Sequence, residues 1–224
     1  MNPVRLSSRA FAEFFGTFML VLVVVGSGIM GESISPDTGV ALLINTISTI
    51  FALLLLILTL GNISGAHFNP AVSIVMALDK KLNARELPSY VFAQIAGAIL
   101  GAVVANGMFD LAWFQISTKV REGFGQYLGE FVATAGLILV ILFLLRDNSS
   151  AKIFWAVPAW IGSAYFFTSS TSFANPAVTA GRIFSDTFAG IAPQSTLLFM
   201  LSQVFAAVTA YAVFKALTNK TEKK

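Results

Sequence analysis

Long apolar runs separated by short polar stretches make up most of the chain. Six of these runs occupy residues 11–29, 40–60, 87–108, 127–145, 153–168 and 195–214. A helix needs about 20 mostly apolar residues to cross a bilayer, and lipid offers no partner for unpaired backbone groups. The pattern therefore predicts an all-α membrane protein with six transmembrane helices.

Two shorter apolar runs, residues 69–78 and 175–184, begin with the same triplet. The triplets are Asn69-Pro70-Ala71 and Asn175-Pro176-Ala177. Asparagine is a favoured N-cap, and proline suits the first helical turn because its missing N–H would have no partner there. Since about ten residues cannot span a bilayer, we expect two re-entrant half-helices.

The order of these elements repeats along the chain, and Glu13 in the first half matches Glu130 in the second. Each half contains three spans. Because three is an odd number, the two halves must insert in opposite directions, with the starts of the half-helices facing each other near the midplane. We expect a single domain over residues 1–224, built from a 3+3 inverted repeat at roughly 9–109 and 126–217.

Composition narrows the possible functions. Of 224 residues, 56% are hydrophobic and 11% are charged, against about 25% charged in a soluble domain. There is no cysteine and only one histidine, so we expect no metal, no cofactor and no enzyme centre. Basic residues lie at the ends of the spans, and the net charge of +3 therefore does not indicate nucleic-acid binding.

The lysines and arginines also predict the orientation. If both termini are cytoplasmic, three of the 14 lie on the outer side, namely Lys119, Arg121 and Arg182, and the other eleven lie inside. Cytoplasmic loops carry the excess of Lys and Arg in membrane proteins. We therefore expect a multi-pass protein of the cell membrane, plasma or inner, with cytoplasmic termini.

The chain resembles the major intrinsic protein family, the aquaporins and aquaglyceroporins, over roughly residues 11–214. The residues that carry the resemblance are the stretches 64–72 and 173–177 together with Glu13, Glu130, Gln94 and Gln203. The resemblance implies an aquaporin-like fold in the lipid bilayer and a homotetramer with one pore per subunit. It also implies passive passage of water or small neutral solutes, with exclusion of protons.

In such a fold, the starts of the half-helices bring about half a positive charge each to the middle of the membrane. The loops that lead into them cannot face lipid and must line a water-filled path. We expect amide donors from Asn69 and Asn175 at the centre of this path. We expect backbone carbonyls along it from Gly65, Ala66, His67, Thr171, Ser172 and Phe173. Neutral hydroxylated solutes can bond to these groups, whereas a cation is repelled.

The sequence departs from the family at the outer filter. Most members have arginine directly after the second triplet, where this chain has Val178. Counting back from the triplets, the resemblance implies the other filter positions at Thr49, Ser163 and Ser172. All four side chains are small and uncharged, which predicts a wider opening than that of a water-only pore. Arg182 lies two turns into the half-helix, and we expect it to reach the headgroups rather than to replace the missing arginine.

Two roles are open for Glu13 and Glu130, which are carboxylates within spans. An intramembrane carboxylate can couple transport to protons. The resemblance favours a structural role, in which each carboxylate accepts hydrogen bonds from the loop of its own half and holds the loop carbonyls in place.

These observations predict a passive channel for small neutral solutes and water. Glycerol- or urea-like molecules and undissociated metalloid hydroxides such as arsenous acid fit the description, and some bacterial relatives carry such metalloids. The alternatives are a water-selective aquaporin and a secondary transporter that uses Glu13 and Glu130. A membrane enzyme would need a nucleophile–base pair or a metal set that the sequence lacks.

Overall fold

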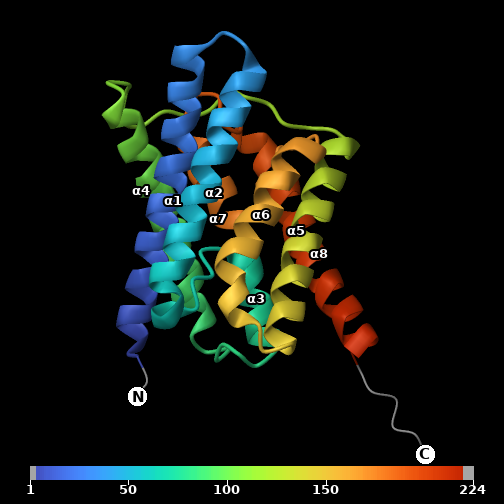
Figure 1. The fold of residues 1–224 in the computed structure, drawn as a ribbon. Coiled ribbons are helices and arrows are strands. Elements are labelled where there is room, and N and C mark those ends of the chain that lie inside the picture. Colours follow the sequence, from blue (N-terminus) through green and yellow to red (C-terminus); the bar gives the residue numbers. More distant parts are fainter. Residues whose placement is uncertain (1–3, 219–224) are drawn as a thin grey trace, which may run out of the picture.

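A computed structural model of the chain describes residues 4–218 as one helical bundle (Figure 1). In chain order the elements are α1 (Leu6–Ile34), α2 (Thr38–Ser64), α3 (Pro70–Leu78), α4 (Leu87–Met108), α5 (Phe124–Arg146), η1 (Ser150–Lys152), α6 (Ile153–Phe167), α7 (Pro176–Gly181), η2 (Arg182–Phe184) and α8 (Pro193–Thr218). Six long helices and two short ones appear where the apolar pattern predicts them, which confirms the fold class. Lys220, Lys223 and Lys224, counted in the orientation prediction, lie outside the described residues.

The long helices form the outer wall of the bundle. Within residues 4–218, α1, α2, α4, α5 and α8 are each long and apolar enough to cross a membrane. The remaining long helix, α6, has 15 residues, about 22 Å, and η1 precedes it. Large apolar side chains cover the outside, and Phe11, Phe92 and Phe205 are each more than 60% exposed. Such a surface suits lipid rather than water, and the chain is a multi-pass membrane protein.

Helices α1 and α4 pack closely because two glycines of α4 face the backbone of α1. A Cβ atom added at Gly97 would collide with the carbonyl oxygen of Phe14, and one added at Gly101 would collide with that of Phe18. Small residues four positions apart let two membrane helices approach in this way. The Gly97–Gly101 spacing thus fixes the position of α1, which carries Glu13 into the core.

The two short helices enter the bundle from opposite ends, α3 from the lower end and α7 from the upper end in Figure 1. Asn69 caps α3 and Asn175 caps α7, with Pro at the first helical position in both cases. The α-helical part of the second half-helix ends at Gly181, and residues up to Phe184 continue as the 3₁₀ turn η2. This element is therefore shorter as an α-helix than the expected 175–184.

Candidate functional site

A cavity of about 370 Å³ passes the starts of both half-helices. Arg9, in the first turn of α1, lines one end, and Arg182 lines the other. The segment after Arg182 reaches the last turns of α1, where the Phe188 N–H donates to the Glu32 carboxylate at 3.0 Å. Since α1 has 29 residues and is about 43 Å long, the cavity follows most of the thickness of the bundle.

Both asparagines line this cavity, and each bonds to the loop of the other half. Asn69 Nδ2 donates to the Ala174 carbonyl at 2.7 Å, and Asn175 Nδ2 donates to the Phe68 carbonyl at 2.7 Å. Their Oδ1 atoms accept from the first turns of their own half-helices, at 2.9 Å from Ala71 N and Ala177 N. Each triplet thus caps its helix and holds the opposite loop. Each asparagine also lines the cavity with an amide that has a second hydrogen left to donate.

The loops that lead into the half-helices share an unusual backbone. Positive φ occurs four, three and one residue before the asparagine in both loops: Gly65, Ala66 and Phe68 in the first, Thr171, Ser172 and Ala174 in the second. Five of these six residues are not glycine, and each costs roughly 1–2 kcal/mol in this conformation. A matched, strained backbone in two separate loops indicates a functional demand on the direction of the carbonyls.

Most of the carbonyl-bearing residues predicted from sequence lie along the cavity. Gly65, Ala66 and His67 line it in the first loop, and Ser172 and Phe173 line it in the second. Thr171 does not contribute to the lining. The lining of the second loop begins one residue later, at Ser172, so the cavity does not include Thr171, contrary to the expectation.

Glu13 lies beneath the first loop and is completely buried. Its Oε1 accepts from Ser64 Oγ at 2.6 Å and His67 N at 2.9 Å, and its Oε2 accepts from Phe68 N and Gln94 Nε2, both at 2.7 Å. All of these partners can donate, which suits an ionised carboxylate that only accepts. The carboxylate therefore satisfies the hydrogen bonding of the buried N–H groups that the irregular loop leaves without backbone partners.

Glu130 has the same position beneath the second loop, again with no exposed surface. It accepts from Phe173 N and Ala174 N, both at 2.8 Å, and from Gln203 Nε2 at 2.6 Å. Neither Glu13 nor Glu130 lines the cavity. A carboxylate that couples transport to protons would have to reach that path. Since neither glutamate does so, the geometry supports the loop-holding role.

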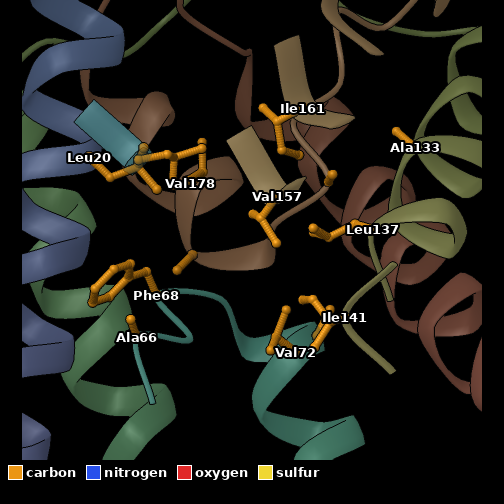
Figure 2. Close-up of a cluster of buried hydrophobic side chains, with 14 of the residues drawn as sticks. Leu20, Ala66, Phe68, Val72, Ala133, Leu137, Ile141, Val157, Ile161 and Val178 are labelled. Carbon is orange, nitrogen blue, oxygen red and sulfur yellow. The ribbon is translucent and has the colours of Figure 1, made fainter. Parts of the chain in front are cut away.

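Apolar side chains form much of the cavity wall. Figure 2 shows Leu20 of α1, Val72 of α3, Leu137 and Ile141 of α5, and Val157 and Ile161 of α6 around a common space, and all of them line the cavity. The path thus offers both polar groups, namely carbonyls and amides, and apolar side chains. A small neutral molecule with hydroxyl groups can contact both kinds of surface, whereas an ion cannot recover its hydration there.

The filter positions expected from sequence are only partly met. The cavity is lined by Thr49, Ser172 and Val178 but not by Ser163. The Ser163 side chain is exposed on the outside of α6 and donates to the Ala159 carbonyl. The lining face of α6 instead carries Val157, Ile161 and Tyr165. These residues are four apart and share one helix face, and Ser163 lies on the other side.

Tyr165 takes the place assigned to Ser163. Its ring is buried, and its hydroxyl lies 3.4 Å from Thr49 Oγ1. The cavity wall beside Thr49 is therefore bulkier than four small side chains would make it. Residues 157, 161 and 165 follow a period of four, but residues 159, 163 and 167 do so as well, so the sequence alone does not single out Tyr165.

Arg182 contradicts the expectation that it reaches the headgroups. Its side chain is 2% exposed and lines the cavity. Its Nε donates to the Ala189 carbonyl, and its guanidinium carbon lies 3.4 Å from the centre of the Phe173 ring. The loop after η2 folds over this side chain and bends it inward, which a straight half-helix would not do.

A second arginine, Arg121, braces the same region from the loop between α4 and α5. Its Nε donates to Gly190 O at 2.8 Å, one terminal nitrogen donates to Phe188 O at 3.2 Å, and its guanidinium carbon lies 5.0 Å from the centre of the Phe173 ring. Burial lowers the pKa of the Arg121 guanidinium to about 10, so it remains cationic at neutral pH. Arg121 does not line the cavity.

His67 and Tyr90, a residue that the sequence did not single out, complete the inner part of the path. His67 lines the cavity while its Nδ1 lies 3.0 Å from Ser73 Oγ. Tyr90 lines the cavity and donates from its hydroxyl to the Ser64 carbonyl at 2.8 Å. These polar groups hold the first loop beside the path.

Comparison with known proteins gives one consistent result. The model of the family described as "Major intrinsic protein" matches residues 1–172. The aquaglyceroporin AqpS of Rhizobium meliloti is 46% identical over 215 residues, which cover 96% of this chain and 92% of that protein. Aquaporin Z of Brucella melitensis is 30% identical over 232 residues, which cover 95% of this chain and 99% of that protein. A solved structure, the aquaglyceroporin from Plasmodium falciparum, has a TM-score of 0.71 at 23% identity, covers 97% of each chain, and shares the fold.

Proposed function

Because this chain belongs to the major intrinsic protein family, we propose that its cavity conducts neutral hydroxylated solutes larger than water, together with water. Family members are passive channels rather than enzymes, and the chain is a channel for water and small neutral solutes. The substrate class is the open point. Glycerol- and urea-like molecules and undissociated metalloid hydroxides such as arsenous acid are the proposed solutes.

One observation carries this substrate class, namely Val178 at the cavity wall directly after the second triplet. A large cationic side chain at this level would narrow the path, whereas valine leaves room and offers an apolar surface. Thr49 Oγ1 and the Tyr165 hydroxyl, which lie 3.4 Å apart, belong to residues that line the same cavity. A polyol or metalloid hydroxide can bond to these hydroxyls and to the loop carbonyls while its centre faces the valine. The name of AqpS as an aquaglyceroporin supports the same class.

The assembly and topology are also proposals. Exposed apolar residues such as Phe51 and Phe205 cover the long helices, and a homotetramer in the cell membrane would cover part of this surface. Cytoplasmic termini follow from the excess of Lys and Arg on that side. Residues 9–109 and 126–217 would then be the two inverted repeats, each with one short helix in the same order.

Stopped-flow light scattering on proteoliposomes tests the proposal. Purified protein is compared with empty liposomes for water, urea, glycerol and larger polyols, and arsenous acid uptake is measured by elemental analysis. Faster flux of glycerol-sized solutes, without dependence on an ion gradient, is expected. Fast water flux with glycerol flux no faster than in empty liposomes would leave a water-selective channel. Accumulation of a solute against its gradient would indicate a transporter instead.

A further inference from the structure

Arg182 is a buried cation at the cavity wall, and it has no acidic partner among residues 4–218. The ion pairs formed within residues 4–218 are Arg9–Glu86, Lys81–Asp79 and Lys215–Asp79, all at the other end of the bundle. In this part of the chain, the Arg182 guanidinium bonds to the protein only through Nε, to Ala189 O. Its terminal nitrogens have no hydrogen-bond partner among these residues, yet they are not completely shielded from solvent. They therefore face the cavity that Arg182 lines.

The position of Arg182 on the half-helix brings its charge toward the filter. The Arg182 N–H bonds to the Val178 carbonyl, so the two residues are one helical turn apart and on the same face. Long helical side chains lean back toward the N-terminus of their helix. The N-terminus of α7 lies at the centre of the cavity, so the guanidinium leans inward over Val178.

The guanidinium is also fixed in place. It stacks on Phe173, 3.4 Å from the centre of the ring, and such a cation–π contact is stronger when water is excluded. Phe173 itself is held by its N–H bond to Glu130 at 2.8 Å. The cation is thus attached to the rigid loop that supplies the carbonyls. A side chain mobile in bulk solvent would not be held in this way.

We propose that Arg182 is the specificity-determining cation of this pore, displaced by one turn from the position of the family's filter arginine. The proposal rests on the proposed channel function and adds to it. Charge selection and size selection are then separated into two layers. Arg182 repels cations in the outer part of the path, while the level of Thr49, Tyr165 and Val178 sets the size limit without a charged side chain.

The test compares ion and solute fluxes in proteoliposomes for wild type, Arg182→Met, Arg182→Lys and the control Arg146→Met, which removes an exposed arginine from the end of α5. Sodium and proton leaks are measured with fluorescent indicators, and solute fluxes by light scattering. Arg182→Met is expected to raise cation leak by between about fivefold and several-hundredfold. The two limits are the factors by which a unit charge roughly 4 Å from the path reduces the population of a cation there. They hold for effective dielectric constants of about 80 and about 20, respectively.

Arg182→Lys and Arg146→Met are expected to keep the wild-type leak, and the size profile for neutral solutes is expected to stay the same in all variants. Unchanged cation leak in a folded Arg182→Met that still conducts neutral solutes would overturn the proposal. If the methionine variant aggregates, Arg182→Gln, which keeps a donor for the Ala189 carbonyl, replaces it. If both fail to fold while Arg146→Met folds, the role of Arg182 is structural and the proposal is wrong. Absence of neutral-solute flux in wild type would count against the channel instead.

Discussion

Glu130 offers the sharpest test of the loop-holding role, through the variants Glu130→Gln and Glu130→Leu. The buried carboxylate accepts from the N–H groups of Phe173 and Ala174, both at 2.8 Å, and from the side-chain amide of Gln203 at 2.6 Å. Glutamine has nearly the same shape and keeps one accepting oxygen. Leucine fills the space but accepts nothing. The two variants therefore separate the loss of charge from the loss of all hydrogen bonds.

The magnitude follows from the number of donors left without a partner. Each buried donor without an acceptor costs about 1–3 kcal/mol, so Glu130→Leu, which leaves three donors, should lose roughly 3–9 kcal/mol. Total stability is typically about 5–15 kcal/mol, and the leucine variant should therefore fold poorly or lose the loop. Glu130→Gln should lose roughly 1–3 kcal/mol and keep most of its flux.

Thermal unfolding in detergent measures the change in stability, and stopped-flow light scattering on proteoliposomes measures the change in flux. The matched control is Glu122→Leu, at an exposed glutamate in the neighbouring loop. We expect wild-type behaviour from the control, a modestly lower Tm for Glu130→Gln and little folded protein for Glu130→Leu. Equal stability and flux in the glutamine and leucine variants would refute the reasoning. A folded glutamine variant with no flux, together with pH-dependent flux in wild type, would point to a coupling carboxylate.

The remaining predictions concern the caps, the filter and the helix packing. Asn69→Ala and Asn175→Ala each remove a helix cap, worth about 1 kcal/mol, and a bond to the opposite loop. The yield of folded protein and the solute flux should therefore both fall. Wild-type flux in both variants would mean that the triplets do not form the centre of the pore. Val178→Arg should lower the flux of solutes bulkier than glycerol far more than that of water, and a folded variant with the wild-type size profile would remove position 178 from the constriction. Gly97→Ala should lower Tm through a loss of about 1–3 kcal/mol, because its Cβ meets the α1 backbone. Gly61→Ala, whose Cβ meets nothing within 4 Å, should keep the wild-type Tm. Equal Tm values for the two variants would show that α1 and α4 can move apart freely.

Several features of the site follow from sequence because they depend on short-range chemistry. The apolar runs fix the spanning helices, since lipid requires every backbone group to be paired within the chain. Asn69 and Asn175 are recognisable as caps because capping involves only the next two or three residues. The repeated order of elements also places Glu13 and Glu130 at matching positions, and the structure puts each beneath the loop of its own half.

Other features depend on the tertiary structure. Counting twelve residues back from Asn175 to Ser163 crosses a loop with positive φ at three positions, so the count cannot give the phase of α6. The observed phase turns Tyr165 to the cavity and Ser163 outward. A shift of two residues on a helix rotates a side chain by about 200°, which is enough to exchange the lining face for the lipid face.

Arg182 shows the same limit for a single side chain. The sequence places it on the half-helix but does not show which way the long side chain extends. That direction is decided by Ala189, whose carbonyl accepts from Nε, and by Phe173, whose ring lies beneath the guanidinium. The two contacts come from separate loops, before and after the half-helix. The chain alone therefore determines that a charge is available near the outer filter, and only the packing of these loops brings it into the path.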